Sequence, residues 1–155
     1  MSNDLRNIHP IHSVAPVADG FAATKAGDVF RLTNLHEAHW LVYRGVGTTG
    51  TTVVTVQACD DVTPSNNSAV AFWYRTNVAT DVWGDWTAAT SAGFTLAAGS
   101  NFMAQVYIPV AALPAGYSFA RLVCTEGVDD PVLGGVLFLG GPQRFSKDAP
   151  ATKIA

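Results

Sequence analysis

Residues 27–61, GDVFRLTNLHEAHWLVYRGVGTTGTTVVTVQACDD, decide the fold class. Residues 39–44 form a run of strand length rich in aromatic and β-branched side chains, and residues 51–58 form a second run with one apolar and one mixed face. The loop between them, residues 45–50, holds three glycines that are free to take positive φ. The pattern predicts an antiparallel hairpin. A hairpin alone is marginally stable, so the rest of the chain must supply a second apolar layer.

The other strands expected from the sequence are short, regularly spaced and separated by turns rich in glycine, proline and asparagine. They cover residues 27–32, 69–75, 85–89, a short stretch between the glycines of residues 91–100, and residues 101–108, 117–125 and 133–139. Residues 109–116, with proline at both ends of a short apolar run, predict one helical turn. Together with the central pair this gives eight or nine strands, which predicts an all-β antiparallel β-sandwich or jelly roll.

Both ends of the chain are expected to lie outside the sandwich body. Residues 1–26 lack clean periodicity, and Pro10 and Pro16 oppose a helix, so this segment is expected to form an extended N-terminal arm. Such an arm either covers a sheet edge or reaches a neighbouring subunit, and the second alternative is favoured slightly. The body is then residues 27–142, and residues 143–155 form a C-terminal tail.

The composition is apolar for a small β protein. Of the 155 residues, 48% are hydrophobic and 14% are charged, whereas about 25% charged residues is typical. A chain with so little charge is expected to bury part of its surface against partners, although a surface coated with Thr, Ser, Asn and Gly is the alternative.

The charge pattern and the hydropathy pattern exclude two classes of partner. The net charge is −3 and no run of lysine and arginine occurs, which argues against nucleic-acid binding. No apolar run reaches 18 residues, so no membrane partner is expected. No signal peptide is recognisable, so synthesis in a reducing cytoplasm is expected.

Metal and disulfide chemistry finds little support. Cys59 and Cys124 form no CxxC motif and are expected to be buried thiols, with a disulfide between them left open. The histidine pairs at residues 9/12 and 36/39 lack the spacing and the helix of a zinc motif. The acidic doublets at residues 60–61 and 129–130 lack the EF-hand spacing, and solvated turn residues are expected there instead of calcium ligands.

No catalytic motif stands out, and neither a catalytic residue nor a cofactor is predicted. The chain contains no GxSxG and no Walker loop, and the glycine-rich GVGTTG at residues 45–50 lies in the predicted hairpin, where a phosphate-binding role is not expected. The histidine pairs are the only hint of an enzyme domain, which is kept as a third hypothesis.

Aromatic residues gather between residues 73 and 86. Trp73, Tyr74, Trp83 and Trp86 lie there, and Trp40 lies in the first strong strand. In a β domain such residues are more often core residues or interface anchors than a carbohydrate-stacking platform, but both interpretations are open.

From about residue 13 to the C-terminus, the sequence resembles the capsid decoration (cement) proteins of tailed phages and prophages. The matching segments are GDxxxLxN at residues 27–34, VYRGVGTTG at 42–50, TVQACDD at 55–61 and FARLVCTEGVDDPVLGGVLFLGGPQRF at 119–145, followed by a short Pro/Ala tail. Their order and spacing carry the resemblance. Cys59 stands where a polar residue such as threonine is expected, so no family role is assigned to it.

The resemblance implies a non-enzymatic virion structural protein that binds the outside of the capsid and stabilises the expanded head. Its partners would be the major capsid protein and further copies of itself, as a homodimer or homotrimer. The residues expected at these interfaces are Leu5, Ile8, Ile11, Trp73, Trp83, Trp86 and Phe145. The alternative function is a tail or fibre-tip module that recognises a host surface glycan through Trp73, Trp83 or Trp86.

Overall fold

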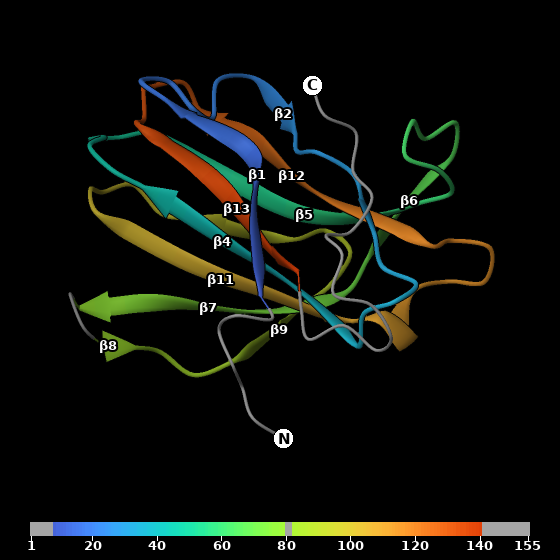
Figure 1. Ribbon diagram of the computed structural model, residues 1–155. Coiled ribbons are helices and arrows are strands. Elements are labelled where there is room, and N and C mark those ends of the chain that lie inside the picture. Colours follow the sequence, from blue (N-terminus) through green and yellow to red (C-terminus); the bar gives the residue numbers. More distant parts are fainter. Residues whose placement is uncertain (1–7, 80–81, 141–155) are drawn as a thin grey trace.

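The computed structural model describes residues 8–79 and 82–140, which form two antiparallel sheets packed face to face (Figure 1). The seven-stranded sheet has the order β1 (His9–Val17), β13 (Gly134–Gly140), β4 (Glu37–Arg44), β11 (Phe102–Pro109), β7 (Phe72–Ala79) and β8 (Val82–Trp83), with β9 (Thr87–Ala89) also paired to β7. The six-stranded sheet has the order β10 (Phe94–Leu96), β5 (Thr51–Cys59), β12 (Phe119–Val128) and β2 (Thr24–Ala26), with β3 (Phe30–Arg31) on β12 and β6 (Asn67–Val70) on β5.

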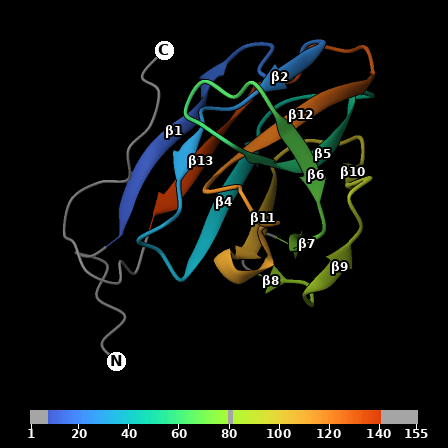
Figure 2. The ribbon, with the colours of Figure 1, turned by 90° about the vertical axis from the view of Figure 1, so that its right-hand side faces the viewer.

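The all-β sandwich predicted from the sequence is therefore confirmed. The described residues form thirteen strands instead of eight or nine, because several are only two to four residues long. The predicted helical turn is present as the 3-10 turn η2 (Val110–Ala112). In Figure 2 the β6 side of the molecule faces the viewer, with β1 and β13 at the left and β9 and β10 at the right.

The predicted hairpin of the first two strong strands is wrong. β4 pairs with β13 and β11 in one sheet, whereas β5 pairs with β10, β6 and β12 in the other. Both strands bury alternate side chains, Trp40 and Val42 on β4 and Val54 and Val56 on β5. The two sheets lie about 10 Å apart, so the buried side chains of β4 pack over those of β5. Residues 45–50 are thus a crossing between the sheets.

Glycine is needed in this crossing because of close packing and not because of unusual φ. None of Gly45, Gly47 and Gly50 has a positive φ, contrary to the expectation. A Cβ on Gly50 would lie 2.7 Å from the carbonyl oxygen of Asp130, and one on Gly47 would lie 3.0 Å from Cγ2 of Val132. The loop packs directly on residues 130–132, which leaves no room for side chains.

The carboxylate of Asp130 holds the crossing loop. Its Oδ2 accepts hydrogen bonds from the backbone N–H groups of Thr48, Thr49 and Gly50 at 3.2, 2.9 and 3.2 Å, and from Oγ1 of Thr48 at 2.9 Å. These bonds, led by that from the Thr49 amide, lower the pKa of Asp130 to about 2. Asp130 was expected to be a solvated turn residue; it instead fixes a loop about 80 residues away.

Acid should therefore destabilise the fold partly through Asp130. Its folded pKa of about 2 lies below the ordinary value of 3.8, so its stabilising contribution is complete above about pH 4 and is lost as the pH falls toward 2. We expect Asp130→Asn to be less stable at neutral pH and to lose less stability between pH 5 and pH 2.5 than the wild type. Urea unfolding across this range measures both effects.

The matched control is Asp129→Asn, because Asp129 is the adjacent and exposed carboxylate. Its pH profile should follow that of the wild type. Equal profiles for Asp130→Asn and the wild type would show that Asp130 does not hold the loop.

Residues 9–26 of the predicted arm cover a sheet edge, which is the first of the two alternatives expected from the sequence. β1 runs along the edge of the seven-stranded sheet, where His9 to His12 pair with Gly140 to Leu137, and β2 pairs with β12. The prolines that excluded a helix are compatible with an edge strand. The arm therefore belongs to the sandwich body and covers a sheet edge. Residues 1–7 and the predicted tail, 143–155, lie outside the described residues.

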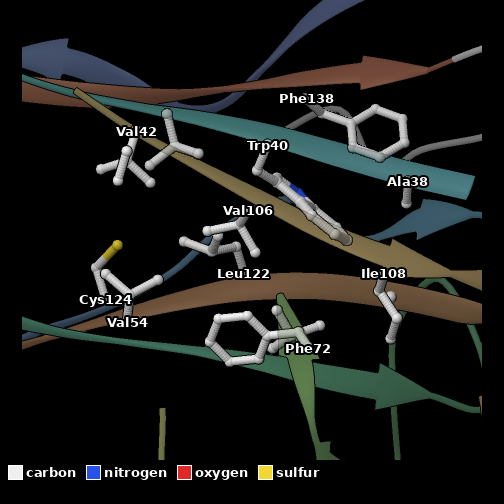
Figure 3. Close-up of a cluster of buried hydrophobic side chains, with 14 of the residues drawn as sticks. Ala38, Trp40, Val42, Val54, Phe72, Val106, Ile108, Leu122, Cys124 and Phe138 are labelled. Carbon is white, nitrogen blue, oxygen red and sulfur yellow. The ribbon is translucent and has the colours of Figure 1, made fainter. Parts of the chain in front are cut away.

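The two sheets meet in one hydrophobic core. Figure 3 shows Trp40, Val106 and Phe138 from the seven-stranded sheet together with Val54 and Leu122 from the six-stranded sheet. All five side chains are fully buried. At about 25 cal/mol per Å² of buried apolar surface, this contact is the main source of stability.

Both cysteines are free thiols buried in the six-stranded sheet. Cys59 lies opposite Phe119 on β12, five residues from Cys124 on the same strand. At about 3.3 Å per residue this places the cysteines roughly 17 Å apart along the sheet, too far for a disulfide. The question left open by the sequence is thereby answered. Burial raises the pKa of Cys124 to about 12.

Candidate functional site

The two outward surfaces of the sandwich differ in chemistry. The outward positions of β5 and β12 carry mainly threonine, valine, glutamine and arginine. In contrast, the outward positions of β4, β11, β7 and β13 carry Glu37, His39, Leu41, Tyr43, Met103, Gln105, Tyr107, Trp73, Arg75, Leu137 and Leu139. We call this surface, together with Trp83 and Trp86, the aromatic face.

Strand register arranges the aromatic face in rows. Tyr107 of β11 lies opposite His39 of β4 and Trp73 of β7. In the next row, Gln105 lies opposite Leu41 and Arg75. Since side chains directly opposite one another on one face are in contact, each row forms a continuous strip across three strands.

The segment of β8 and β9 folds back along β7 and adds two tryptophans to the face. Trp83 pairs with Asn77, and residues 87–89 pair with residues 72–74. The guanidinium carbon of Arg75 lies 5.0 Å from the ring centre of Trp83 and 4.7 Å from that of Trp86. Arg75 is therefore in cation–π contact with two indoles.

Trp86 also meets the first row. Its ring centre lies 5.9 Å from that of Tyr107 in an edge-to-face arrangement, and the Tyr107 ring lies 5.0 Å from the imidazole of His39. Together with Trp73 these three residues line an open hollow of about 420 Å³. Trp73 and Trp86 remain 45% and 39% exposed, which is a large apolar area for a surface without a partner.

His39 is the polar group in the wall of the hollow. Its Nε2 lies 3.1 Å from Oε1 of Glu37, two residues earlier on the same strand. Its Nδ1 is buried and has no hydrogen-bond partner among the described residues. Because Nδ1 is buried and Nε2 lies beside Glu37, the lining that the hollow offers a ligand is mainly aromatic.

The structure separates the aromatic residues singled out in the sequence. Trp40 is fully buried, and Tyr74 stacks on Phe94 with ring centres 3.8 Å apart, so these two belong to the core side. Trp73, Trp83 and Trp86 gather on the aromatic face.

The other predicted interface residues are not part of the aromatic cluster. Ile11 is partly buried and packs against the core from β1. Ile8 is half-buried just before β1. Leu5 and Phe145 lie outside the described residues.

Sequence reasoning missed His39, Arg75, Gln105 and Tyr107 as members of the cluster. Each occupies an outward position of an alternating strand, and that signal was readable. The pairing of β11 between β4 and β7 brings them together, and no local pattern in the sequence specifies it.

The described residues contain neither a cluster of metal-ligating side chains nor a membrane-spanning helix. Across residues 8–79 and 82–140, no group of three or more His, Cys, Asp or Glu side chains is placed to hold a metal ion. No helix in this part of the chain is long and apolar enough to span a bilayer. No protein-family model matches the sequence, and no similar curated protein or solved structure was found.

Proposed function

We propose that this chain is a virion structural protein without enzymatic activity, which binds the outer surface of a phage capsid as a decoration protein and stabilises the expanded head. The observation that supports this most is the aromatic face, a strip of exposed tryptophan and tyrosine on one sheet only. Tryptophan, tyrosine and arginine are the residues that most often dominate binding energy at protein interfaces. The low charge of the chain and the resemblance of its sequence motifs agree with the proposal.

The physical basis is binding by many copies. Each copy that binds the expanded shell, and not its precursor, stabilises the expanded shell by mass action. Self-association into a homodimer or homotrimer would let several faces contact neighbouring capsomers at once, which raises the effective affinity without new contacts. In this proposal the chain is made in the host cytoplasm and its partners are the major capsid protein and further copies of itself.

Truncating the aromatic face should weaken binding to the head. We expect Trp73→Ala and Trp86→Ala each to reduce the affinity of the full-length protein for purified expanded heads by about 10- to 100-fold, because each removes an exposed anchor. Co-sedimentation with the heads over a range of protein concentrations measures the change, and unfolding by urea checks that both variants remain folded.

Val53→Ala and Thr125→Ala are the matched controls, since both residues occupy outward positions on the opposite sheet. They should bind the heads as the wild type does. If the tryptophan variants also bound with full affinity, the aromatic face would not be the docking surface.

A second candidate function is recognition of a host surface glycan by a tail or fibre-tip module. The aromatic lining of the hollow favours it, because sugar rings stack on exposed indoles such as those of Trp73 and Trp86. A glycan array probed with the purified protein separates the two functions. Saturable glycan binding with only a few copies in each particle supports the second; many copies and no glycan binding support the first.

A further inference from the structure

Arg75 is held rigidly but its hydrogen-bonding capacity is only partly used. Two tryptophan rings contact the guanidinium, and its Nε and Nη2 both donate to Oε1 of Gln105, at 2.9 and 2.7 Å. Among the described residues, Nη1 donates no hydrogen bond and no carboxylate forms an ion pair with Arg75. Within the described part of the chain, the aromatic face thus carries a positive charge at Arg75 that no carboxylate pairs with, since Glu37 on the same face lies against His39.

The opposite sheet provides an internal comparison. Arg121 of β12 donates from Nε to Oε1 of Gln57 on the neighbouring strand at 2.9 Å, so the same Arg–Gln pair exists there. No aromatic ring is in cation–π contact with Arg121 among the described residues. The cross-strand pair is therefore ordinary for this sandwich, and the two indoles are what distinguish Arg75.

The charge and the hollow are adjacent because Trp86 contacts both. One side of the site is the guanidinium beside the Trp86 ring, and the other is the hollow between Trp86, Trp73 and Tyr107. A volume of about 420 Å³ is sufficient for one aromatic side chain with part of its backbone. A guanidinium with a free N–H edge is suited to a carboxylate, with which it forms charge-assisted hydrogen bonds.

We infer that the site binds a protein segment in which an aromatic side chain, placed in the hollow, lies next to an aspartate or glutamate that pairs with Arg75. The inference rests on the proposed function and specifies the chemistry of the partner surface. The occupant is a protein and not an acidic sugar because the apolar strip continues beyond the hollow. Leu41, Met103 and Leu137 extend it across β4, β11 and β13, an area that a single sugar would leave uncovered.

A pair of small probes tests this pairing of ring and charge. The probes are 3-phenylpropionate, a benzene ring two methylenes from a carboxylate, and 3-phenylpropionamide, which has the same shape without the charge. In NMR titrations of the full-length protein, followed at the indole N–H signals, we expect 3-phenylpropionate to bind with a Kd of roughly 1–10 mM. The amide should bind about five- to tenfold more weakly.

Two variants assign the preference to Arg75. Arg75→Gln should bind both probes equally, because a purely structural role of Arg75 would not depend on the charge of the probe. In the wild type, the preference for 3-phenylpropionate should shrink as the sodium chloride concentration is raised. Arg121→Gln, which alters the matching pair on the other sheet, should keep the full preference.

Three results with these probes would overturn the inference: equal binding of the two by the wild type, a preference that survives in Arg75→Gln, or no saturable binding of either. Glucuronate, an acidic sugar titrated in the same way, provides a fourth: it would overturn the inference by binding more tightly than 3-phenylpropionate. The last result would replace the protein segment with an acidic sugar. If any of them occurred while Trp73 and Trp86 were still required for head binding, the role of Arg75 would fail and the proposed function would stand.

Discussion

Replacement of Phe138 by alanine should lower the free energy of unfolding by about 3–5 kcal/mol. Phe138 is completely buried on β13, in the seven-stranded sheet. Its ring stacks on Phe30 of β3, in the other sheet, with ring centres 4.0 Å apart, and lies 5.3 Å from the ring of Trp40. The substitution removes a ring that joins the two sheets and leaves a cavity between them. The urea concentration at the unfolding midpoint, with the slope of the transition, measures the loss.

Leu139→Ala is the control within the same strand. Leu139 points to the opposite side of β13 and is only half-buried, so its truncation should cost about 1 kcal/mol. Losses of equal size for the two variants would contradict the position of Phe138 at the centre of the core.

Arg44→Met should be nearly as damaging, with an expected loss of about 3–5 kcal/mol. Arg44 is fully buried at the end of β4. Its guanidinium donates to the carbonyl oxygen of Ala97 at 2.6 Å and to that of Gly50. Burial lowers the pKa of Arg44, and the charge of Asp130 partly offsets this effect. Methionine fills the volume but leaves both carbonyl groups without their donor and the loop without its positive charge.

Arg31→Met is the matched control, because Arg31 is exposed and its Nε donates to Oγ1 of Thr33 at 2.9 Å. Its stability should stay within about 0.5 kcal/mol of the wild type. Combining Arg44→Met with Asp130→Asn adds a second test. Because the two groups hold the same loop, the double variant should lose less stability than the two single losses added together. Strict additivity would mean that Arg44 and Asp130 act independently.

The alternation of apolar side chains predicted the strands well and the pairing of strands poorly. The inward faces of β5 and β11 follow the period of two read from residues 51–58 and 101–108. The hairpin expected around residues 45–50 failed because a glycine-rich loop of six residues connects equally well within a sheet and between sheets. The deciding interactions come from Asp130 and Val132, about 80 residues later in the chain.

Residues 69–75 show a similar limit. They are apolar on both faces, which predicted one central strand or one covered by a partner. The structure instead has β6 in one sheet and β7 in the other, with the change at Ala71 and with Val70 and Phe72 both buried. Part of the apolar character thus serves a crossing between sheets, and Trp73 points outward in the row of Tyr107.

The candidate site was predictable in residue type but not in arrangement. Three tryptophans between residues 73 and 86 indicated an interface or a stacking surface, and all three lie on the aromatic face. The contact of Arg75 with Trp83 and Trp86 depends on β8 and β9 folding back along β7, and the hollow depends on Tyr107 lying between β4 and β7. Such long-range pairings are decided by the whole core and not by local sequence.

The most direct test of the docking surface is hydroxyl-radical footprinting of the full-length protein, free and bound to expanded heads. Our account predicts that binding strongly reduces the oxidation of Trp73, Trp86 and Tyr107, while Phe119 on the opposite sheet is oxidised at the same rate in both states. Protection of Phe119 together with unchanged oxidation of Trp73 and Trp86 would contradict it, because the head would then contact the other side of the sandwich.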